Sequence, residues 1–124
     1  MSREYTRVSF QLSCDQRLVA GVGGALAYFA DRAGLAERSR ESLVTALEEF
    51  CLDGVTVAGG ATEPLDVAIE DFEDRIEIVV EHHAARDAAA SKERGALRRL
   101  ARAVDRVECD ACEGSIRTKL VKFL

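Results

Sequence analysis

Two short segments of alternating apolar residues constrain the fold of this chain more than any other feature. Apolar residues occupy every second position in residues 65–69 and again in residues 76–80. Period-two alternation is typical of half-buried β-strands. The polar pair Glu73-Asp74 lies between the two segments and can form the turn. The sequence therefore predicts an antiparallel hairpin, whose apolar face must be buried against a second layer.

The remaining patterns place further strands and helices around this hairpin. Residues 5–12 alternate in the same way and predict a first strand, whereas residues 82–92 lack a clear period and predict a loop. Apolar residues at helical spacing predict helices over 15–33, 39–54 and 93–104, and a closing hairpin over 106–111 and 115–123 turns at Glu113-Gly114. The predicted fold class is a two-layer α/β sandwich in a single domain, residues 1–124. It has a mixed, mostly antiparallel sheet, three helices on one face and the order βααββαββ.

The predicted helix over residues 15–33 begins at Asp15 and contains three glycines. Its apolar stripe is formed by Leu18, Val22, Leu26 and Phe29, and Gly34 follows as the terminating residue. Each glycine inside a helix costs about 1 kcal/mol relative to alanine. The glycines at positions 21, 23 and 24 do not form a phosphate-binding G-x-G-x-x-G motif, so we expect them to permit close approach of a neighbouring helix or strand.

The predicted helix over residues 39–54 carries the strongest indication of function. We expect Ser39 to cap its N-terminus and Gly54 to end it. Glu49 and Asp53 are four residues apart and therefore lie one above the other near its C-terminal end. This acidic pair is either a solvated surface or part of a site for phosphate and metal.

Composition and charge limit the functional classes. The 124 residues are 48% hydrophobic, enough for one compact core, and the absence of a signal peptide or an apolar run of about 20 residues predicts a cytoplasmic protein. A net charge of −5 argues against nucleic acid as the main partner. Residues 1–91 hold 8 basic and 17 acidic groups, whereas residues 92–124 hold 9 and 5. The basic C-terminal part is either a solvated surface or a patch for an acidic protein or a phosphate.

The four cysteines do not predict a disulfide framework. Cys14 and Cys51 are flanked by apolar residues and are expected in the core. Cys109 and Cys112 form a C-x-x-C string, and a zinc site would need a second pair of ligands such as His82 and His83. Positions three apart on a strand point to opposite faces, which disfavours metal binding by this pair.

The element order and three sequence stretches resemble the histidine-kinase-like (GHKL, or Bergerat) ATPase fold, specifically the anti-sigma-factor serine/threonine kinases. The stretches are AERSRESLVTALEEFCLDGV, RIEIVVEHH and GALRRLARAVDRVECDACEGSIRTKLVKFL. Together they extend the resemblance over nearly the whole chain. In the family, a glycine-containing box opens the third helix and an aspartate leads into the closing hairpin. Gly95, Leu97, Asp105 and Gly114 fit this plan.

The resemblance also implies site residues, several of which depart from the family pattern. The family's Glu-x-x-x-Asn motif, which orients the reacting hydroxyl and holds magnesium, corresponds here to Glu49 and Asp53. The family's Asp-x-Gly-x-Gly motif, which accepts from adenine, corresponds to Glu81 and the four residues after it, which include no glycine. Of the third nucleotide box only Gly95 is kept. The nucleotide-binding boxes are therefore degenerate.

Two hypotheses follow from this resemblance. In the first, the chain is a non-catalytic anti-sigma-factor-like regulator, a pseudokinase that needs no cofactor. It would bind a sigma factor, an anti-anti-sigma (STAS-type) protein or a related regulator through a helical surface that includes Arg94, Arg98, Arg99 and Arg102. In the second, it is an active serine kinase using ATP and Mg²⁺, with Glu49 as base and Asp53 on the metal. Relatives commonly form homodimers, and the sequence leaves the oligomeric state open.

Overall fold

The computed structural model describes residues 6–12, 15–55, 65–83, 90–112 and 114–124. Three α-helices, one π-helix and five strands lie in these ranges. In chain order they are β1 (Thr6–Leu12), α1 (Gln16–Arg32), α2 (Glu37–Glu49), η1 (Phe50–Val55), β2 (Leu65–Asp71), β3 (Arg75–His83), α4 (Ala90–Ala101), β4 (Arg106–Cys112) and β5 (Ser115–Phe123).

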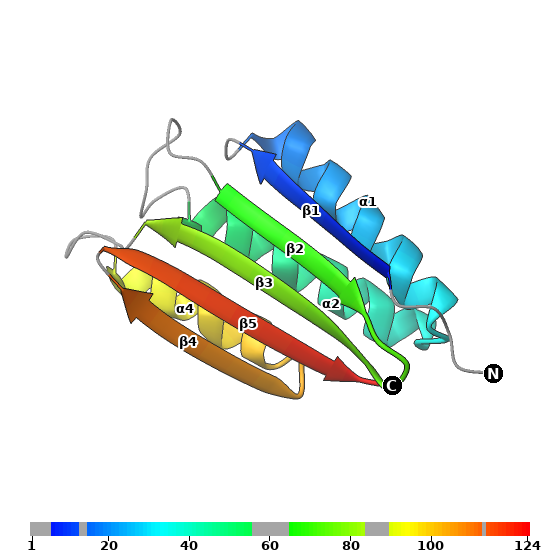
Figure 1. Ribbon diagram of the computed structural model, residues 1–124. Coiled ribbons are helices and arrows are strands. Elements are labelled where there is room, and N and C mark those ends of the chain that lie inside the picture. The colour runs from blue at the N-terminus through cyan, green and yellow to red at the C-terminus, as the bar shows by residue number, and fades with distance from the viewer. Residues whose placement is uncertain (1–5, 13–14, 56–64, 84–89, 113) are drawn as a thin grey trace.

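The strands form one sheet in the order β1-β2-β3-β5-β4, and every neighbouring pair is antiparallel. Figure 1 shows the three described α-helices on one face of this sheet, and no described helix lies on the other face. The predicted two-layer α/β sandwich is confirmed. The sheet was predicted to be mixed and mostly antiparallel, and all the described strand pairs are antiparallel.

The alternation in β2 and β3 produces the core, as the sequence predicted. The apolar residues of both strands that point toward the helices are at most 1% exposed. Against them pack Leu26 of α1, Leu43 and Leu47 of α2, and Leu100 of α4, each at most 1% exposed. Burial of this apolar surface is the main stabilising term for the two layers. Among the described helices, none is both long and apolar enough to cross a membrane.

Helix α1 confirms its predicted ends but not all of its predicted stripe. The Asp15 side chain accepts a hydrogen bond from the Arg17 backbone N–H at 2.8 Å, and Gly34 follows the helix with φ of 85°. That positive φ suits glycine at a helix end. The prediction that Leu18 faces the core is wrong, because Leu18 is 50% exposed and Val19 takes the buried position.

Helix α2 differs from its prediction at both ends. It begins at Glu37, with Ala36 as its N-cap residue and no side-chain hydrogen bond there, so Ser39 lies inside the first turn. Gly54 does not end the helix at an ordinary cap, because the chain continues from Glu49 directly into η1. A π-helix has i→i+5 hydrogen bonds and is rare, so the apolar spacing alone could not predict it.

Helix α4 begins at Ala90 and ends at Ala101, three residues earlier at each end than predicted. Ala101 is exposed rather than inward, and Ala103 and Val104 just beyond the helix are buried. The predicted loop over 82–92 is correspondingly shorter, since 82–83 belong to β3 and 90–92 to α4, and 84–89 lie outside the described residues. The closing hairpin turns at Gly114 with φ of 81°, as predicted.

Candidate functional site

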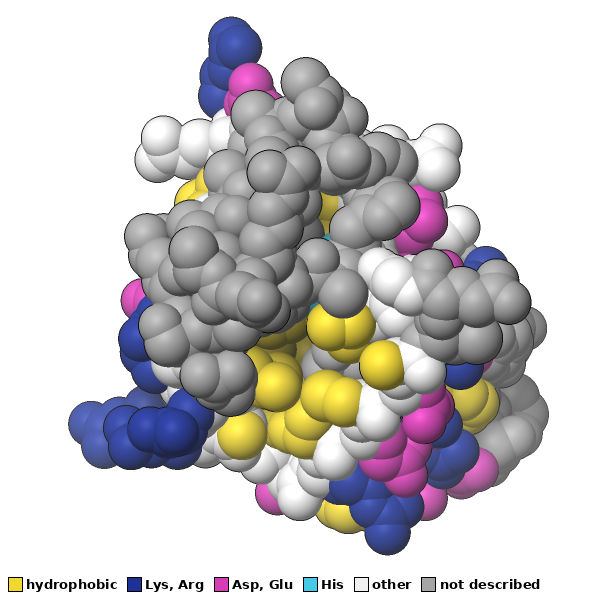
Figure 2. Space-filling model, turned by 90° about the vertical axis from the view of Figure 1, so that its left-hand side faces the viewer, with side chains coloured by type: hydrophobic (Ala, Val, Ile, Leu, Met, Phe, Trp, Pro, Cys, Tyr) yellow, Lys and Arg dark blue, Asp and Glu magenta, His cyan; other side chains and the backbone are white. Residues whose placement is uncertain are grey.

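An apolar pocket opens at the end of the molecule where β3 and β4 finish, beside the start of η1. It encloses about 240 Å³, and its lining residues come from the π-helix, from α4 and from three strands: Phe50, His82, Leu97, Cys109, Asp110, Ala111, Ile116 and Thr118. Figure 2 views this end and shows hydrophobic side chains gathered in a recess with charged side chains along part of its rim.

The pocket wall packs around His82, which is only 4% exposed. The edge of its ring contacts Phe50, with centroids 6.0 Å apart and planes at 72°. Its backbone carbonyl accepts a hydrogen bond from the Ser115 hydroxyl at 3.4 Å. Thr118, 1% exposed, has its hydroxyl 3.7 Å from the Cys109 sulfur. The wall can therefore offer a small ligand mainly apolar contact, with a few polar atoms at fixed positions.

Glu49, the predicted catalytic acid, lies at the last position of α2, on the outer side of the helical layer. Its carboxylate forms an ion pair with the Arg99 guanidinium of α4, with Nε and Oε2 3.4 Å apart. Both side chains are nearly half exposed, 44% for Glu49 and 49% for Arg99. The arginine offsets the unfavourable interaction of an acid with the C-terminal end of a helix.

The Glu49–Arg99 pair is part of a shallow groove between α2 and α4, which we call the α2/α4 groove. Its volume is about 430 Å³, and it is lined by charged, hydroxyl and small residues: Arg38, Glu41, Ser42, Thr45, Ala46, Glu49, Arg99, Arg102 and Ala103. Acidic residues on α2 thus face arginines on α4 and on the turn after it. The predicted basic patch is therefore divided: Arg99 and Arg102 line a groove of mixed charge, whereas Arg98 is exposed outside it.

For two other predicted site residues, the structure describes the backbone but not the side chain. The backbone of Asp53 belongs to η1 and that of Arg94 to α4, but their side chains lie outside the described part of the chain. Gly95 lies in α4, where an added β-carbon would be 3.8 Å from the Arg99 guanidinium, an ordinary contact distance. The packing of described residues therefore does not require glycine at this position.

Glu81 is not brought into the same site as Glu49. It is exposed on the helix-free face of the sheet, paired across the strands with Asp66 on one side and Arg117 on the other. Successive residues of a strand point to opposite faces, so His82 rather than Glu81 faces the helices and the apolar pocket. The inward positions Ile76, Ile78 and Val80 already imply this orientation. The assignment of Glu81 to an adenine site beside Glu49 therefore has no support from its position.

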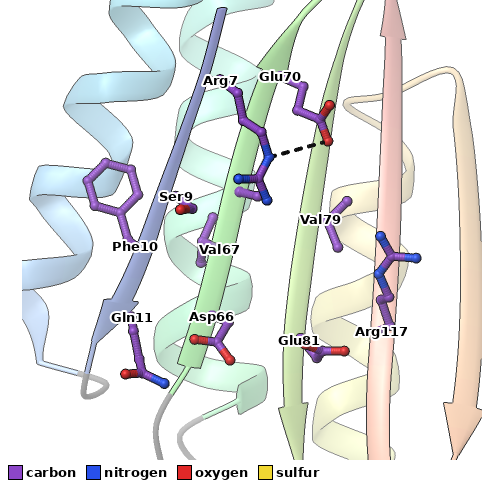
Figure 3. Close-up of a pocket in the computed structure, with 11 residues that line it drawn as sticks. Arg7, Ser9, Phe10, Gln11, Asp66, Val67, Glu70, Val79, Glu81 and Arg117 are labelled. Carbon is purple, nitrogen blue, oxygen red and sulfur yellow. Dashed lines mark ion pairs between the residues drawn. The ribbon is translucent and has the colours of Figure 1, made fainter.

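The helix-free face around Glu81 has a cavity of its own, of about 510 Å³. Figure 3 shows charged side chains above, below and on the β5 side of Val79, whereas Ser9 and Gln11 lie along the β1 side. Arg7 forms an ion pair with Glu70 at 3.9 Å along one side. Asp66 and Glu81 lie directly opposite each other, a like-charge arrangement that is unfavourable across two strands.

Sequence inspection missed Glu77, the neighbour of this cavity on β3. Its carboxylate is 8% exposed and lies 2.6 Å from the Arg75 Nε and 2.9 Å from the Lys119 Nζ. Burial alone would raise the pKa of Glu77, but the hydrogen bonds from Arg75 and Lys119 outweigh it, so the pKa lies below the usual range of a glutamate. The available signal was that charged residues at 75, 77 and 81 alternate with the inward-facing apolar residues of β3, which places them on the opposite face of the strand.

The cysteines and histidines that could contribute to a zinc site are described only in part. Cys51 is buried, as expected, and Cys14 lies outside the described ranges. Cys109 lines the apolar pocket, while the Cys112 and His83 side chains are not described. Within the part of the chain that is described, no three His, Cys, Asp or Glu residues are grouped to hold a metal ion.

Comparisons with known proteins support the fold and little beyond it. Searches of protein-family models and of curated proteins found no match. Among solved structures, the chain is similar to the crystal structure of the RsbU and RsbW domains of Rv1364c from Mycobacterium tuberculosis. The match has a TM-score of 0.66 and 14% sequence identity, and it covers 95% of this chain but only 32% of the other. At this identity, the similarity shows that the two chains share a fold.

Proposed function

We propose that this chain is an anti-sigma-factor-like regulator that acts by binding partner proteins and not by transferring phosphate. The sequence resemblance and the structural similarity to a chain with RsbU and RsbW domains support a role in partner switching. Its proposed partners are a sigma factor, an anti-anti-sigma protein of the STAS type, or a related regulator.

The separation of Glu49 from Glu81 carries the non-catalytic part of this proposal. Phosphoryl transfer depends almost entirely on positioning the nucleotide, metal and nucleophile in one place. Here Glu49 is paired with Arg99 on the outer side of the helices, and Glu81 lies beyond the sheet. Two of the residues that the resemblance assigns to nucleotide chemistry, Glu49 and Glu81, therefore lie on opposite sides of the sheet.

The lining of the apolar pocket is a second argument for this proposal. A bound triphosphate needs cations or converging backbone N–H groups around its charge. The pocket lining includes Asp110, which repels phosphate, and contains no lysine or arginine among its described residues. The described lining of this pocket thus does not fit a magnesium–triphosphate group.

We propose the α2/α4 groove as the surface that binds the partner. Its alternating acidic and basic side chains can be matched by a partner with the complementary order of charges, which gives specificity and faster association more than raw affinity. Ser42 and Thr45 add hydrogen-bonding groups between these charges. The groove is shallow and open, as expected for a protein partner.

An active ATP-dependent kinase is the alternative, with Glu49 as base, Asp53 on magnesium and Gly95 near the nucleotide. One observation favours it: the apolar pocket begins at Phe50, the residue directly after Glu49. Under this alternative, Glu49→Ala should abolish phosphoryl transfer and leave nucleotide binding intact.

Titration with ATP and Mg²⁺, followed by calorimetry and thermal shift, separates the two functions. We expect neither heat nor stabilisation at millimolar ATP, and saturable magnesium-dependent binding would contradict the non-catalytic proposal. Partner binding is then measured with purified sigma factors and STAS proteins from the same genome. Arg102→Glu should weaken binding, and Glu49→Ala should weaken it too, because both residues line the groove. Arg98→Glu, an exposed arginine outside the groove, is the matched control.

A further inference from the structure

Strand β4 forms an open edge of the sheet. It is the last strand in the order β1-β2-β3-β5-β4. Figure 1 shows no described element outside it, whereas α1 lies alongside the other edge strand, β1. The outer side of an edge strand presents backbone N–H and C=O groups that can hydrogen-bond to another chain. β4 can therefore accept a further strand at a place where the described part of this chain supplies none.

The features that usually protect an edge strand are missing from β4. It is seven residues long and contains neither proline nor lysine. Its pairing with β5 runs from Arg106 opposite Val121 to Cys112 opposite Ser115 without a bulge. Proteins normally blunt an exposed edge with one of these features, because a regular edge pairs readily with other strands. A regular and unprotected edge indicates a strand that another chain covers.

On the side of β4 that faces the helices, an added strand would meet apolar surface. Val107 packs against the core, and Cys109 and Ala111 line the apolar pocket while remaining exposed. Leu97 of α4 lines the same pocket. Apolar side chains opposite these β4 residues would bury the exposed part of this surface, which favours binding.

On the helix-free face, β4 presents a fixed order of charges. Arg106, Glu108 and Asp110 are all exposed there, and they alternate with the apolar positions. Opposite charges at directly facing positions stabilise a strand pair, and like charges destabilise it. The complementary strand therefore carries basic residues opposite Glu108 and Asp110, and an acidic residue opposite Arg106.

We propose that β4 binds an extended segment of a partner protein, which joins the sheet as an antiparallel strand. All described strand pairs are antiparallel, and this pairing is slightly more stable per residue than parallel pairing. From its N-terminus the segment has the order apolar, basic, apolar, basic, apolar, acidic, and it pairs with β4 from Ala111 back to Arg106. Backbone hydrogen bonds supply the affinity of such a complex, and the alternating side chains supply its specificity.

This edge is separate from the α2/α4 groove, so the inference goes beyond the proposed function and does not depend on it. A synthetic peptide tests it on the full chain. The central residues of the peptide are valine, lysine, valine, lysine, valine and glutamate, and a control peptide has the same residues without the alternation. Calorimetry measures binding, and amide hydrogen exchange followed by NMR locates it. We expect exchange to slow at alternate residues of β4, whose N–H groups point outward, and to stay unchanged in β1.

Reversal of one charge on β4 provides the sharpest comparison. Glu108→Lys should weaken binding of the alternating peptide by about tenfold, because an attractive pair becomes a repulsive one. A peptide with glutamate in place of the facing lysine should recover that loss, which also shows that the variant is folded. Glu73→Lys is the matched control, since it makes the same change of charge at an exposed position between β2 and β3, and it should leave binding unchanged.

Three results would overturn the inference. The first is that the alternating peptide does not bind at millimolar concentration, or binds no better than the control peptide. The second is that exchange slows in β1 or along the α2/α4 groove in place of β4. The third is that the free chain self-associates and already protects the outward amides of β4, because the occupant of the edge would then be a second copy.

Discussion

The Glu48 side chain of α2 lies across Gly23 of α1, so close that a β-carbon at position 23 would overlap its carboxylate. This contact explains one of the three glycines in α1, because the Glu48 side chain would have to shift to admit a larger residue. Gly23 is buried and Glu48 is half-buried, so the contact belongs to the packed interface between the helices.

The first prediction measures this contact by a double-mutant cycle. In dilute protein, Gly24→Ala should stabilise α1 by about 1 kcal/mol, because its β-carbon meets open space. Gly23→Ala should stabilise the protein much less than Gly24→Ala, or destabilise it, because the Glu48 side chain must move away. In a protein that already carries Glu48→Ala, Gly23→Ala should stabilise α1 as much as Gly24→Ala does. Chemical denaturation provides the free energies, and equal effects of Gly23→Ala in both backgrounds would show that the two residues do not interact.

The second prediction concerns acid unfolding and Glu77. The pKa of Glu77 is lower in the folded protein than in the unfolded chain. At pH values between these two pKa values, the folded state therefore binds fewer protons than the unfolded state. The stabilisation is complete above the unfolded pKa and is lost as the pH falls through the folded pKa. Glu77→Gln should therefore flatten the acid side of the stability profile and cost roughly 1 to 2 kcal/mol at pH 7, reduced by the partial exposure of Arg75 and Lys119.

Unfolding by urea at several pH values tests this expectation. Glu108→Gln is the control, because Glu108 is an exposed acid on β4 whose cross-strand partner is the same Lys119. A Glu77→Gln profile parallel to that of the wild type would show that Glu77 does not set the acid sensitivity.

The extent to which the sequence determined these features depends on how local they are. Gly34 and Gly114 were predictable, because a positive φ at a helix end or a hairpin turn is a property of a few neighbouring residues. The direction of Glu81 also follows from local alternation, because it lies between the buried residues Val80 and His82. A motif comparison is sensitive to a shift of one residue, and on a strand such a shift reverses the side of the sheet.

Features that join distant segments were not predictable from one sequence. The Glu49–Arg99 pair joins residues 50 positions apart, and its geometry depends on how α2 and α4 pack. The sequence also could not predict that Val19 rather than Leu18 is buried. Both residues are apolar and adjacent, so only the position of the helix on the sheet decides between them. The π-helix has no distinct apolar period that would separate it from a continued α-helix.

The third prediction is that the Glu49–Arg99 ion pair contributes little to stability. Both side chains are nearly half exposed, and pairs of this kind typically contribute 0.2 to 1 kcal/mol. A cycle of Glu49→Ala and Arg99→Ala should give a coupling free energy of about 0.5 kcal/mol that falls with added salt. A coupling of several kcal/mol would show that the pair is structural, and Glu49→Ala could then no longer test function without disturbing the fold.

The fourth prediction tests whether the apolar pocket is rigid enough to select a ligand. Phe50 is 1% exposed and forms one wall of the pocket, so Phe50→Ala should destabilise the protein by about 3 to 5 kcal/mol and enlarge the cavity. Phe123→Ala removes the same ring from a half-exposed position and should cost far less. Thermal unfolding compares the two variants directly. Similar losses would mean that the packing at Phe50 collapses to fill the space, in which case the pocket has no fixed shape and the apolar recess is an adaptable surface.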